Sequence, residues 1–322
     1  MSLVLLPLLG LVLVAVVLKL LLGSGLAARI AVDLPNERSL HAAPVPRIGG
    51  IVLLGVALAG AAFVAPALRP TLLIAAVLGL VSAWDDRHGL PVPLRFAVHV
   101  AAAAGAIVVL HVDTVPWVML VMALLLTWAM NLYNFMDGAD GLAGGMALFG
   151  FGALGVAATG PAPELATACF CIAAAAGGFL LHNFHPARVF LGDAGSIPLG
   201  FLAGCLGLAG WGQSLWPAWF PLLVFSPFIV DASLTLAARV LRGQRPWQAH
   251  REHAYQRMVA GGLGHRRTAL LWYALMGACA ASALLGLRLD PAHQWGLISG
   301  WVAIYGILAT VTTWRFPLPK KR

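Results

Sequence analysis

Long apolar runs alternate with short polar segments along the whole chain. A transmembrane helix needs roughly 20 consecutive, mostly apolar residues, and most of the runs approach this length. Eleven such runs can be counted, at residues 3–22, 48–66, 71–84, 96–110, 115–130, 141–159, 165–182, 197–216, 219–240, 269–287 and 295–315. The pattern therefore predicts an all-α protein, a polytopic transmembrane helix bundle of about eleven spans.

The third run, residues 71–84, is short enough to be a re-entrant or buried segment, but the distribution of positive charge favours a full span. Lys and Arg gather in the cytoplasmic loops of membrane proteins. When all eleven runs are counted as spans, 17 of the 20 Lys and Arg residues fall on one side. This asymmetry predicts an outward N-terminus and a cytoplasmic C-terminus.

The composition supports a membrane protein and excludes two other classes. Hydrophobic residues make up 61% of the chain and charged residues only 10%, whereas soluble globular proteins carry about 25% charged residues. Disordered chains combine low hydrophobicity with high charge, which is the opposite composition. We expect a single membrane domain over residues 1–322, because no polar stretch is long enough to hold its own core. Its cytoplasmic face should consist of loops 23–47, 85–95, 131–140, 183–196 and 241–268.

Nine of the twelve acidic residues lie at or near the predicted cytoplasmic face. A carboxylate beside hydrocarbon is costly, and such residues are usually functional. Asp85 and Asp86 directly follow the third apolar run. Two adjacent carboxylates are tolerated there if a divalent cation or an Arg neutralises them, or if one has a raised pKa. The alternative is an ordinary solvated helix end that pairs with Arg87.

A second polar group has members spaced by three residues: Asn131, Asn134, Asp137 and Asp140. This spacing makes successive members neighbours on a helix end, and the glycines that follow open the turn. Oxygen-bearing side chains beside flexible backbone suit a nucleotide or a hard cation, since Mg²⁺ prefers one or two carboxylates plus phosphate oxygens. A purely structural polar turn is the alternative.

Three further features add to the predicted cytoplasmic face. Asp193 lies in a Gly-Asp-x-Gly-Ser segment, where glycines let backbone N–H groups approach a phosphate. The basic segment 241–268 contains His250 and His253 and suits an anionic, phosphate-rich ligand. The alternatives for it are a zinc site, which lacks a third ligand, or a loop attracted to anionic lipid. Asp231 interrupts an apolar run, and we expect it to anchor a cytoplasmic loop rather than to bind a cation or proton.

Together these motifs resemble the polyprenyl-phosphate N-acetylhexosamine-1-phosphate transferase family, in its surface-glycan or O-antigen initiating branch, related to phospho-N-acetylmuramoyl-pentapeptide transferase. The resemblance is carried by residues 33–41, 46–50, 85–90, 131–145, 192–196, Asp231 and 250–257. Two departures matter: Arg38-Ser39 replaces the basic pair often seen before His41, and His-x-x-His replaces a contiguous histidine run. Both point away from the peptidoglycan precursor. The last motif, residues 250–257, resembles the branch that transfers N-acetylglucosamine or a 6-deoxy N-acetylhexosamine, such as N-acetylfucosamine or N-acetylquinovosamine.

The resemblance implies an enzyme of the bacterial cytoplasmic (inner) membrane. Its polyprenyl phosphate would attack the β-phosphorus of a UDP-N-acetylhexosamine and release UMP. The implied cofactor is Mg²⁺, with Mn²⁺ able to replace it, held by Asp193 and Asp86. Asp85 and Asp86 would be catalytic and would activate or orient the lipid phosphate. The substrate-binding residues would be Asn131, Asn134, Asp137, Asp140, Arg47, His41, His250, His253 and Arg257.

A competing hypothesis from another class is a cation- or proton-coupled membrane transporter that uses Asp86, Asp140 and Asp231. Transporters usually carry paired repeats with broken helices that meet at the bilayer midplane. The sequence shows no such repeat, and its acids gather at one face. We therefore favour the transferase, with membrane lipid and no nucleic acid among its partners, and leave monomer and homodimer open.

Overall fold

The structure, a computed structural model, describes residues 4–33, 35, 40, 43–112, 114–245, 248 and 250–318. This part of the chain is mostly helical, which confirms the predicted all-α class. The only strands among the described residues are β1 (Val32–Asp33) and β2 (Val45–Pro46). They pair antiparallel, with Val32 opposite Pro46 and Asp33 opposite Val45.

All eleven predicted apolar runs are helical. The helices are α1 (Leu5–Gly23), α2 (Leu26–Ile30), α3 (Gly49–Val64), α4 (Arg69–His88), α5 (Val92–Val109), α6 (Pro116–Phe135), α7 (Leu142–Ala158), α8 (Pro163–Asn183), α9 (Asp193–Gly212), α10 (Trp219–Val224), α11 (Ser226–Leu241), α12 (Ala254–Met258), α13 (Gly264–Gly286) and α14 (Pro291–Arg315). Short 3₁₀ and π turns precede α4 and α13, at Pro66–Leu68 and Val259–Leu263. Within the described ranges, eight helical segments are long and apolar enough to cross a membrane. The number of spans and their orientation stay predictions.

Helix α4 extends beyond the short third apolar run, residues 71–84, and is long enough to cross a membrane. It is a continuous helix of 20 residues, which corresponds to a length of about 30 Å at 1.5 Å per residue. Asp85 and Asp86 therefore lie in its last turn and do not belong to the loop that follows. Gly89 ends the helix with a φ of 70°, a conformation that costs glycine little.

The run 219–240 forms two helices instead of one, because Pro227 interrupts it. Proline lacks an N–H and displaces the carbonyl four residues before it, which here belongs to Leu223. That carbonyl accepts a hydrogen bond from the Ser226 hydroxyl at 2.7 Å. At the break between α10 and α11, the Leu223 carbonyl would otherwise lack a hydrogen-bond partner in the apolar interior, and the Ser226 hydroxyl supplies one.

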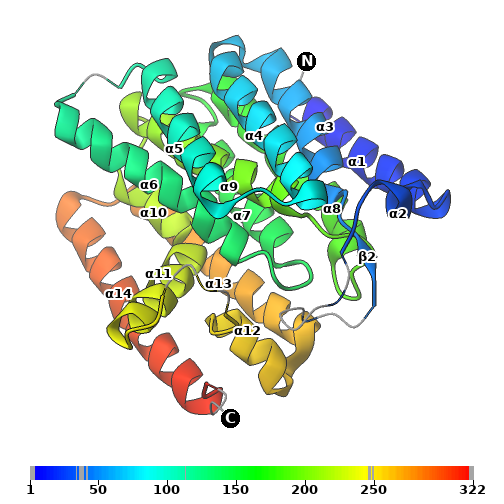
Figure 1. Ribbon diagram of the computed structural model, residues 1–322. Helices are drawn as coiled ribbons and strands as arrows, with labels where there is room; N and C mark the ends of the chain where they lie inside the picture. The colour runs from blue at the N-terminus through cyan, green and yellow to red at the C-terminus, as the bar shows by residue number, and fades with distance from the viewer. Residues whose placement is uncertain are drawn as a thin grey trace.

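The helices pack closely around α8 and α9. Helix α8 contacts α1, α3 and α7, and α9 lies against α4 and α6. Figure 1 shows these helices in the upper body of the molecule and α11–α14 below it. Small residues permit close helix contacts in membrane proteins: a Cβ at Gly178 would lie 2.3 Å from the Leu11 carbonyl oxygen. At Gly200 it would lie 2.5 Å from the carbonyl oxygen of Ala129.

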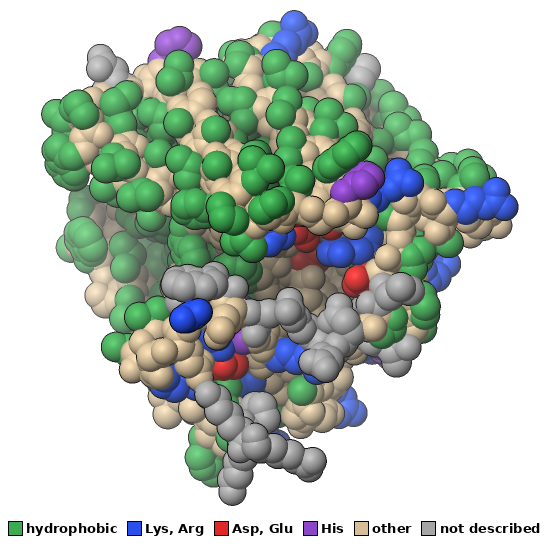
Figure 2. Space-filling view, in the orientation of Figure 1, with side chains coloured by type: hydrophobic (Ala, Val, Ile, Leu, Met, Phe, Trp, Pro, Cys, Tyr) green, Lys and Arg blue, Asp and Glu red, His purple; other side chains and the backbone are tan. Residues whose placement is uncertain are grey.

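The outer surface is strongly apolar. Leu80, Val108 and Trp314 are between 71% and 81% exposed, and Figure 2 shows a broad hydrophobic surface over the upper part of the molecule. Exposed apolar patches of this extent mark contact with a membrane or another protein. Together with the eight long apolar helices, this surface indicates a multi-pass membrane protein.

Candidate active site

Two helices bring three aspartates together. Asp85 and Asp86 end α4, and Asp193 begins α9. The backbone N–H of Ala194 donates to Asp86 Oδ2 at 3.2 Å, which fixes the end of α4 to the start of α9. Gly192 has a φ of 74°, and a Cβ there would lie only 2.8 Å from Asp86 Oδ2. The glycine is therefore required for this approach.

Arg47 lies between several of the carboxylates. Its Nη2 is 3.3 Å from Asp193 Oδ1 and 3.4 Å from Asp86 Oδ1, and its Nη1 is 3.7 Å from Asp33 Oδ1. Burial alone would lower the pKa of Arg47, but the attraction of Asp86, Asp193 and Asp33 outweighs it, and the pKa is raised above its ordinary value. The guanidinium is therefore a permanent cation at the centre of an anionic group.

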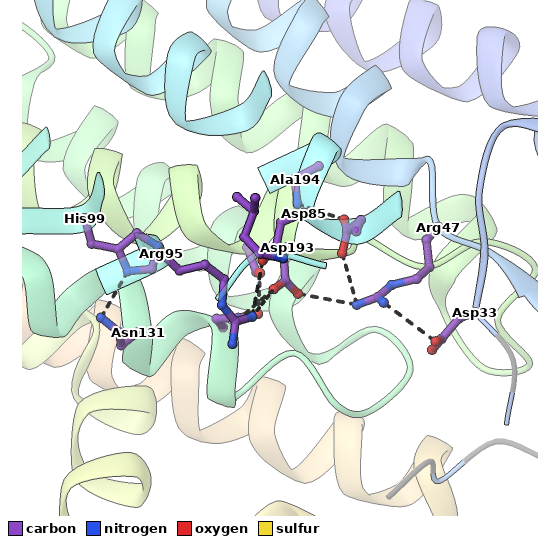
Figure 3. Close-up of polar contacts among 12 residues, drawn as sticks. Asp33, Arg47, Asp85, Arg95, His99, Asn131, Asp193 and Ala194 are labelled. Atoms are coloured by element: carbon purple, nitrogen blue, oxygen red, sulfur yellow. Dashed lines mark hydrogen bonds and ion pairs between the residues drawn. The ribbon is translucent and has the colours of Figure 1, made fainter. Parts of the chain in front are cut away.

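Arg95 approaches the same aspartates from another helix. Its Nη1 is 3.2 Å from Asp85 Oδ2 and 3.9 Å from Asp193 Oδ2. In Figure 3 the side chains of Arg47 and Arg95 reach Asp193 from opposite sides. Figure 2 shows acidic and basic side chains gathered in a hollow below the apolar surface. We call Asp33, Arg47, Asp85, Asp86, Arg95 and Asp193 the aspartate–arginine cluster.

Of the four residues spaced by three, Asn134 contacts this cluster directly. Its Nδ2 is 3.5 Å from Asp193 Oδ2, and its Oδ1 accepts a hydrogen bond from the Ser196 hydroxyl at 2.8 Å. Asn131 is directed elsewhere: its Nδ2 donates to the Thr127 carbonyl at 2.7 Å and lies 3.3 Å from His99 Nδ1. The predicted loop 131–140 therefore begins as the last turns of α6, and its first asparagine serves packing between helices.

Asp137 lies in the turn after α6, within electrostatic reach of the cluster. The pKa of its carboxyl is well above the ordinary value, because burial disfavours the ionised form. Arg47 lowers the pKa, but Asp193 and Asp86 raise it again by repulsion. A cation bound nearby would favour ionisation. Asp140 belongs to a different environment, since its Oδ2 lies 2.6 Å from His185 Nδ1.

Asp231 anchors the segment that carries the predicted histidines. Its carboxylate accepts hydrogen bonds from the backbone N–H groups of Ala254 at 2.8 Å and Tyr255 at 3.2 Å. The residue is only 7% exposed. These bonds confirm that Asp231 anchors a loop through buried hydrogen bonds, since the N-terminal groups of α12 need such acceptors. That this loop is cytoplasmic stays a prediction.

His250 and His253 are packed against the end of α6. The ring of His253 stacks on Phe135, with centroids 6.2 Å apart, and His250 lies 4.9 Å from His253. The pKa of His250 is lowered to about 4 by burial, by His253 and by Arg239, so this ring is neutral at pH 7. In the described part of the chain, no hydrogen bond or ion pair joins either histidine to the aspartate–arginine cluster.

Arg257 and His41 complete the predicted set. Arg257 Nη1 donates to the Phe316 carbonyl at 3.1 Å, so the structure directs it toward the C-terminal segment. His41 lies outside the described residues. Several buried polar atoms in this region have no hydrogen-bond partner among the described atoms, namely Arg239 Nε, Gln244 Oε1, His253 Nδ1 and Arg257 Nε. His253 Nδ1 lies 3.6 Å from Asp231 Oδ1.

Sequence reasoning missed Arg95 as a member of the site and gave no role to Asp33 or Ser196. A signal for Arg95 existed, because only the turn at 89–91 separates α4 from the helix that begins at Val92. An Arg in the first turn of that helix must lie near the end of α4. Asp33 depends on the β1–β2 pairing that places it beside Arg47, which no sequence pattern indicated.

The chain was compared with known proteins. Residues 68–210 match the family model described as glycosyl transferase family 4. The chain is 29% identical to the decaprenyl-phosphate N-acetylglucosaminephosphotransferase of Mycolicibacterium smegmatis, over 87% of this chain and 81% of that protein. It is 28% identical to the probable undecaprenyl-phosphate N-acetylglucosaminyl 1-phosphate transferase of Bacillus subtilis, over 79% and 77%. The resemblance to polyprenyl-phosphate N-acetylhexosamine-1-phosphate transferases is confirmed.

A third relative of the same kind is the undecaprenyl-phosphate alpha-N-acetylglucosaminyl 1-phosphate transferase of Yersinia pestis, 29% identical over 83% of this chain and 80% of its own. The segment that matches glycosyl transferase family 4 contains Asp85, Asp86, Asp193 and the polar residues 131–140. Arg47 and Asp33 enter the same cluster from outside that segment. These comparisons lend no support to the transporter hypothesis.

Proposed function

We propose that this protein transfers N-acetylhexosamine-1-phosphate from a UDP-sugar to polyprenyl phosphate at the inner face of the bacterial cytoplasmic membrane and releases UMP. The sugar would be N-acetylglucosamine or a 6-deoxy N-acetylhexosamine, and the product would initiate a lipid-linked surface glycan. One observation carries the proposal: Asp85, Asp86 and Asp193 meet Arg47 and Arg95 at the ends of apolar helices. The names of the relatives include a polyprenyl phosphate and N-acetylglucosamine, which supports a lipid phosphate and an N-acetylhexosamine donor as the substrates.

Mg²⁺ is the cofactor that this proposal requires, with Mn²⁺ able to replace it. The residues present fit such an ion, because four carboxylates face two guanidinium groups and leave an excess of two negative charges when all are ionised. The pKa of Asp137 is raised mainly by burial, and repulsion by Asp193, Asp86 and Asp33 adds to this effect. Asp193 and Asp86 would hold the ion, since hard cations select carboxylate oxygens. When bound, it would neutralise the diphosphate of the sugar nucleotide.

The protein groups would act mainly by positioning. Phosphoryl transfer requires alignment and charge stabilisation more than covalent protein chemistry. Arg47 and Arg95 have 28% and 38% of their side chains exposed and can present two N–H groups to a phosphate. Asp85 would orient or activate the lipid phosphate, because its Oδ2 already lies beside Arg95, the cation that would bind that phosphate.

The remaining polar groups would hold the nucleotide. Asn134, fixed by Ser196, and Asp137 border the cluster, and Asn131 and Asp140 flank them along the chain. His250 is neutral at pH 7, so it would serve as a hydrogen-bond donor and not as a cation. The buried N–H at Arg257 Nε, which has no hydrogen-bond partner among the described atoms, supports a phosphate-binding role for this segment.

A reconstituted assay tests the proposal. Purified protein in nanodiscs receives polyprenyl phosphate and a panel of UDP-N-acetylhexosamines, and UMP release is measured. We expect release that depends on both substrates and on Mg²⁺, with one sugar preferred. Release independent of the lipid phosphate would contradict the proposal, as would turnover by Asp85→Asn equal to that of the unmodified protein. Asp290→Asn is the matched control, because Asp290 caps α14 far along the chain from the cluster.

A further inference from the structure

A second group of ionisable side chains lies apart from the aspartate–arginine cluster. It consists of Asp140 in the turn after α6, His185 in the loop after α8, and His265 in the first turn of α13. One ligand atom from each residue lies within 4.8 Å of the other two. Asp140 Oδ2 is 2.6 Å from His185 Nδ1, and Asp140 Oδ1 is 3.4 Å from His265 Nδ1.

The hydrogen bonds of His265 fix its tautomer. Its Nε2 lies 3.2 Å from the Leu40 carbonyl oxygen, which can only accept, so Nε2 carries the proton. Its Nδ1 accepts the backbone N–H of Asp140 at 3.1 Å, so this nitrogen carries a lone pair. That lone pair accepts the Asp140 N–H, which a bound ion would have to displace. Asp140 Oδ1 is a second acceptor, 3.4 Å from the same nitrogen with no proton between them, and the two repel each other. A cation would remove this repulsion.

The arrangement of His265 matches that of a metal ligand in a further respect. Histidines that bind metals usually donate their second N–H to a carboxylate or a backbone carbonyl, which sets the ring orientation. Leu40 supplies that carbonyl for His265. The ring of His185 stacks parallel to that of His265, with an interplanar angle of 5° and centroids 5.4 Å apart. Both imidazoles thus flank the carboxylate of Asp140.

We propose that Asp140, His185 and His265 form a binding site for a divalent transition-metal ion of the Zn²⁺ type. Zinc binds His nitrogen and carboxylate oxygen at about 2.0–2.2 Å, which separates tetrahedral ligands by about 3.3–3.5 Å. The distance of 3.4 Å between Asp140 Oδ1 and His265 Nδ1 agrees with this spacing. The 2.6 Å between Asp140 Oδ2 and His185 Nδ1 is a hydrogen-bond distance, so these two atoms must move apart when the ion binds. Imidazole ligands favour such ions over Mg²⁺. This site therefore differs in chemistry from the one proposed at Asp193.

The surroundings hold the three residues in place and leave one side open. The turn that carries Asp140 is fixed because the N–H of Gly141 donates to Asn183 Oδ1 at 2.9 Å and its carbonyl accepts from the Tyr273 hydroxyl at 2.7 Å. His185 lines an open pocket of about 580 Å³ together with Arg188 and Tyr273. The pocket therefore gives solvent access to the His185 side of the group.

Binding would have two consequences. The ion would replace the Nδ1 proton that His185 shares with Asp140, because only a ring nitrogen without a proton can bind a metal. The ion would also join three segments that are distant in sequence, and a ligand that binds only the folded state raises stability. It would also hold Asp140 beside His185 and His265, so that Asp140 would not bind the nucleotide.

The test measures metal binding in the full-length protein without sugar nucleotide or lipid phosphate. After removal of metals by a chelator, Co²⁺ is titrated and its visible absorption recorded, and Zn²⁺ is then added in competition. We expect one Co²⁺ per chain with the spectrum of nitrogen and oxygen ligands, displacement by Zn²⁺, and a higher unfolding temperature with either ion. His185→Ala and His265→Gln should each weaken binding by about tenfold or more.

His293→Ala is the matched control, because His293 has the same Nδ1 contact with a carboxylate, that of Asp290, but no third ligand among the described residues. It should bind Co²⁺ like the unmodified protein. Asp193→Asn should keep the Co²⁺ spectrum while losing sugar-phosphate transfer, which separates this inference from the proposed function. Equal Co²⁺ binding by the unmodified protein, His185→Ala and His265→Gln would reduce the group to a hydrogen-bonded network and overturn the proposal.

Discussion

At the scale of single residues, the decisive feature is charge that the protein itself does not balance. Asp33, Asp85, Asp86 and Asp193 exceed Arg47 and Arg95 in number, and the pKa of Asp137 is raised beside them. Such clusters are typical of sites that bind a cation or shift protons. The sequence predicted most of these carboxylates, because an acid next to an apolar run is costly without a function.

Asp193→Asn should abolish most of the transferase activity. The amide removes one negative charge from the place where a cation and the diphosphate would meet, and loss of one group that stabilises developing charge typically lowers kcat by about 10²–10³-fold. Activity of the unmodified protein should disappear with EDTA and return with Mg²⁺ or Mn²⁺. UMP release is the measurement, and a folded variant is verified by its unfolding temperature. Full turnover in chelator would remove the metal from the mechanism.

Asp137→Asn should stabilise the metal-free protein at alkaline pH. The folded-state pKa of Asp137 is raised above 3.8, so the folded state binds this proton more tightly than the unfolded state. Stability is therefore lost as the pH rises from about 4 through the folded-state pKa, and the loss is about 1.4 kcal/mol for each pH unit that separates the folded-state pKa from the unfolded-state pKa. Asparagine has no titrating carboxyl group, so Asp137→Asn does not lose stability in this way as the pH rises.

Thermal unfolding in EDTA between pH 5 and pH 8 measures the effect. The unfolding temperature of Asp137→Asn should exceed that of the unmodified protein at pH 8, and the difference should shrink toward pH 5 and on addition of Mg²⁺. Asp290→Asn serves again as the control. A constant difference across this range would show that Asp137 does not titrate as the structure implies.

At the scale of elements, sequence reasoning identified every long helix but not where helices break or how their ends meet. A long apolar run predicts that a helix is present, because a membrane interior tolerates no unsatisfied backbone group. The break before α11 depends on Pro227 and on the hydroxyl of Ser226, and the site depends on the approach of Gly192 to Asp86. These are contacts between segments, and periodicity in one segment does not encode them. The anchoring role of Asp231 could be predicted from the sequence, because it is the one acidic residue in the apolar run 219–240.

Asp231→Ala should destabilise the protein and displace α12. The change leaves the buried N–H groups of Ala254 and Tyr255 without their acceptor, and an unpaired buried group costs about 1–3 kcal/mol. Asp231→Asn keeps one acceptor oxygen and should lose less. Unfolding temperature and protease cleavage between residues 242 and 253 are the measurements.

Thr235→Val is the control for this experiment, since Thr235 bonds the same carboxylate from within α11 and does not hold α12. It should unfold near the temperature of the unmodified protein. Equal stability of Asp231→Ala and Asp231→Asn would mean that these hydrogen bonds do not anchor the segment.

At the scale of the whole molecule, the candidate site and the charge asymmetry share one end of the helices. Asp85 and Asp86 lie in the last turn of α4, whereas Arg69 begins it, so about 25 Å of helix separates them. His265 and Arg266 begin α13, and Arg288 follows its end. A cytosolic sugar nucleotide can reach the cluster only if the Asp85 end of α4 is cytoplasmic, which is the orientation that the 17-to-2 partition of basic residues predicts.

Cysteine labelling in intact cells tests this orientation directly. The four native cysteines are buried, so an impermeant maleimide should report only on introduced ones. Arg69→Cys and Arg288→Cys should react from outside, and Arg188→Cys and Arg266→Cys only after the cells are opened, because all four positions are exposed but lie at opposite helix ends. Outside labelling at Arg266→Cys would place the aspartate–arginine cluster away from cytosolic UDP-sugar and refute both the topology and the transferase mechanism.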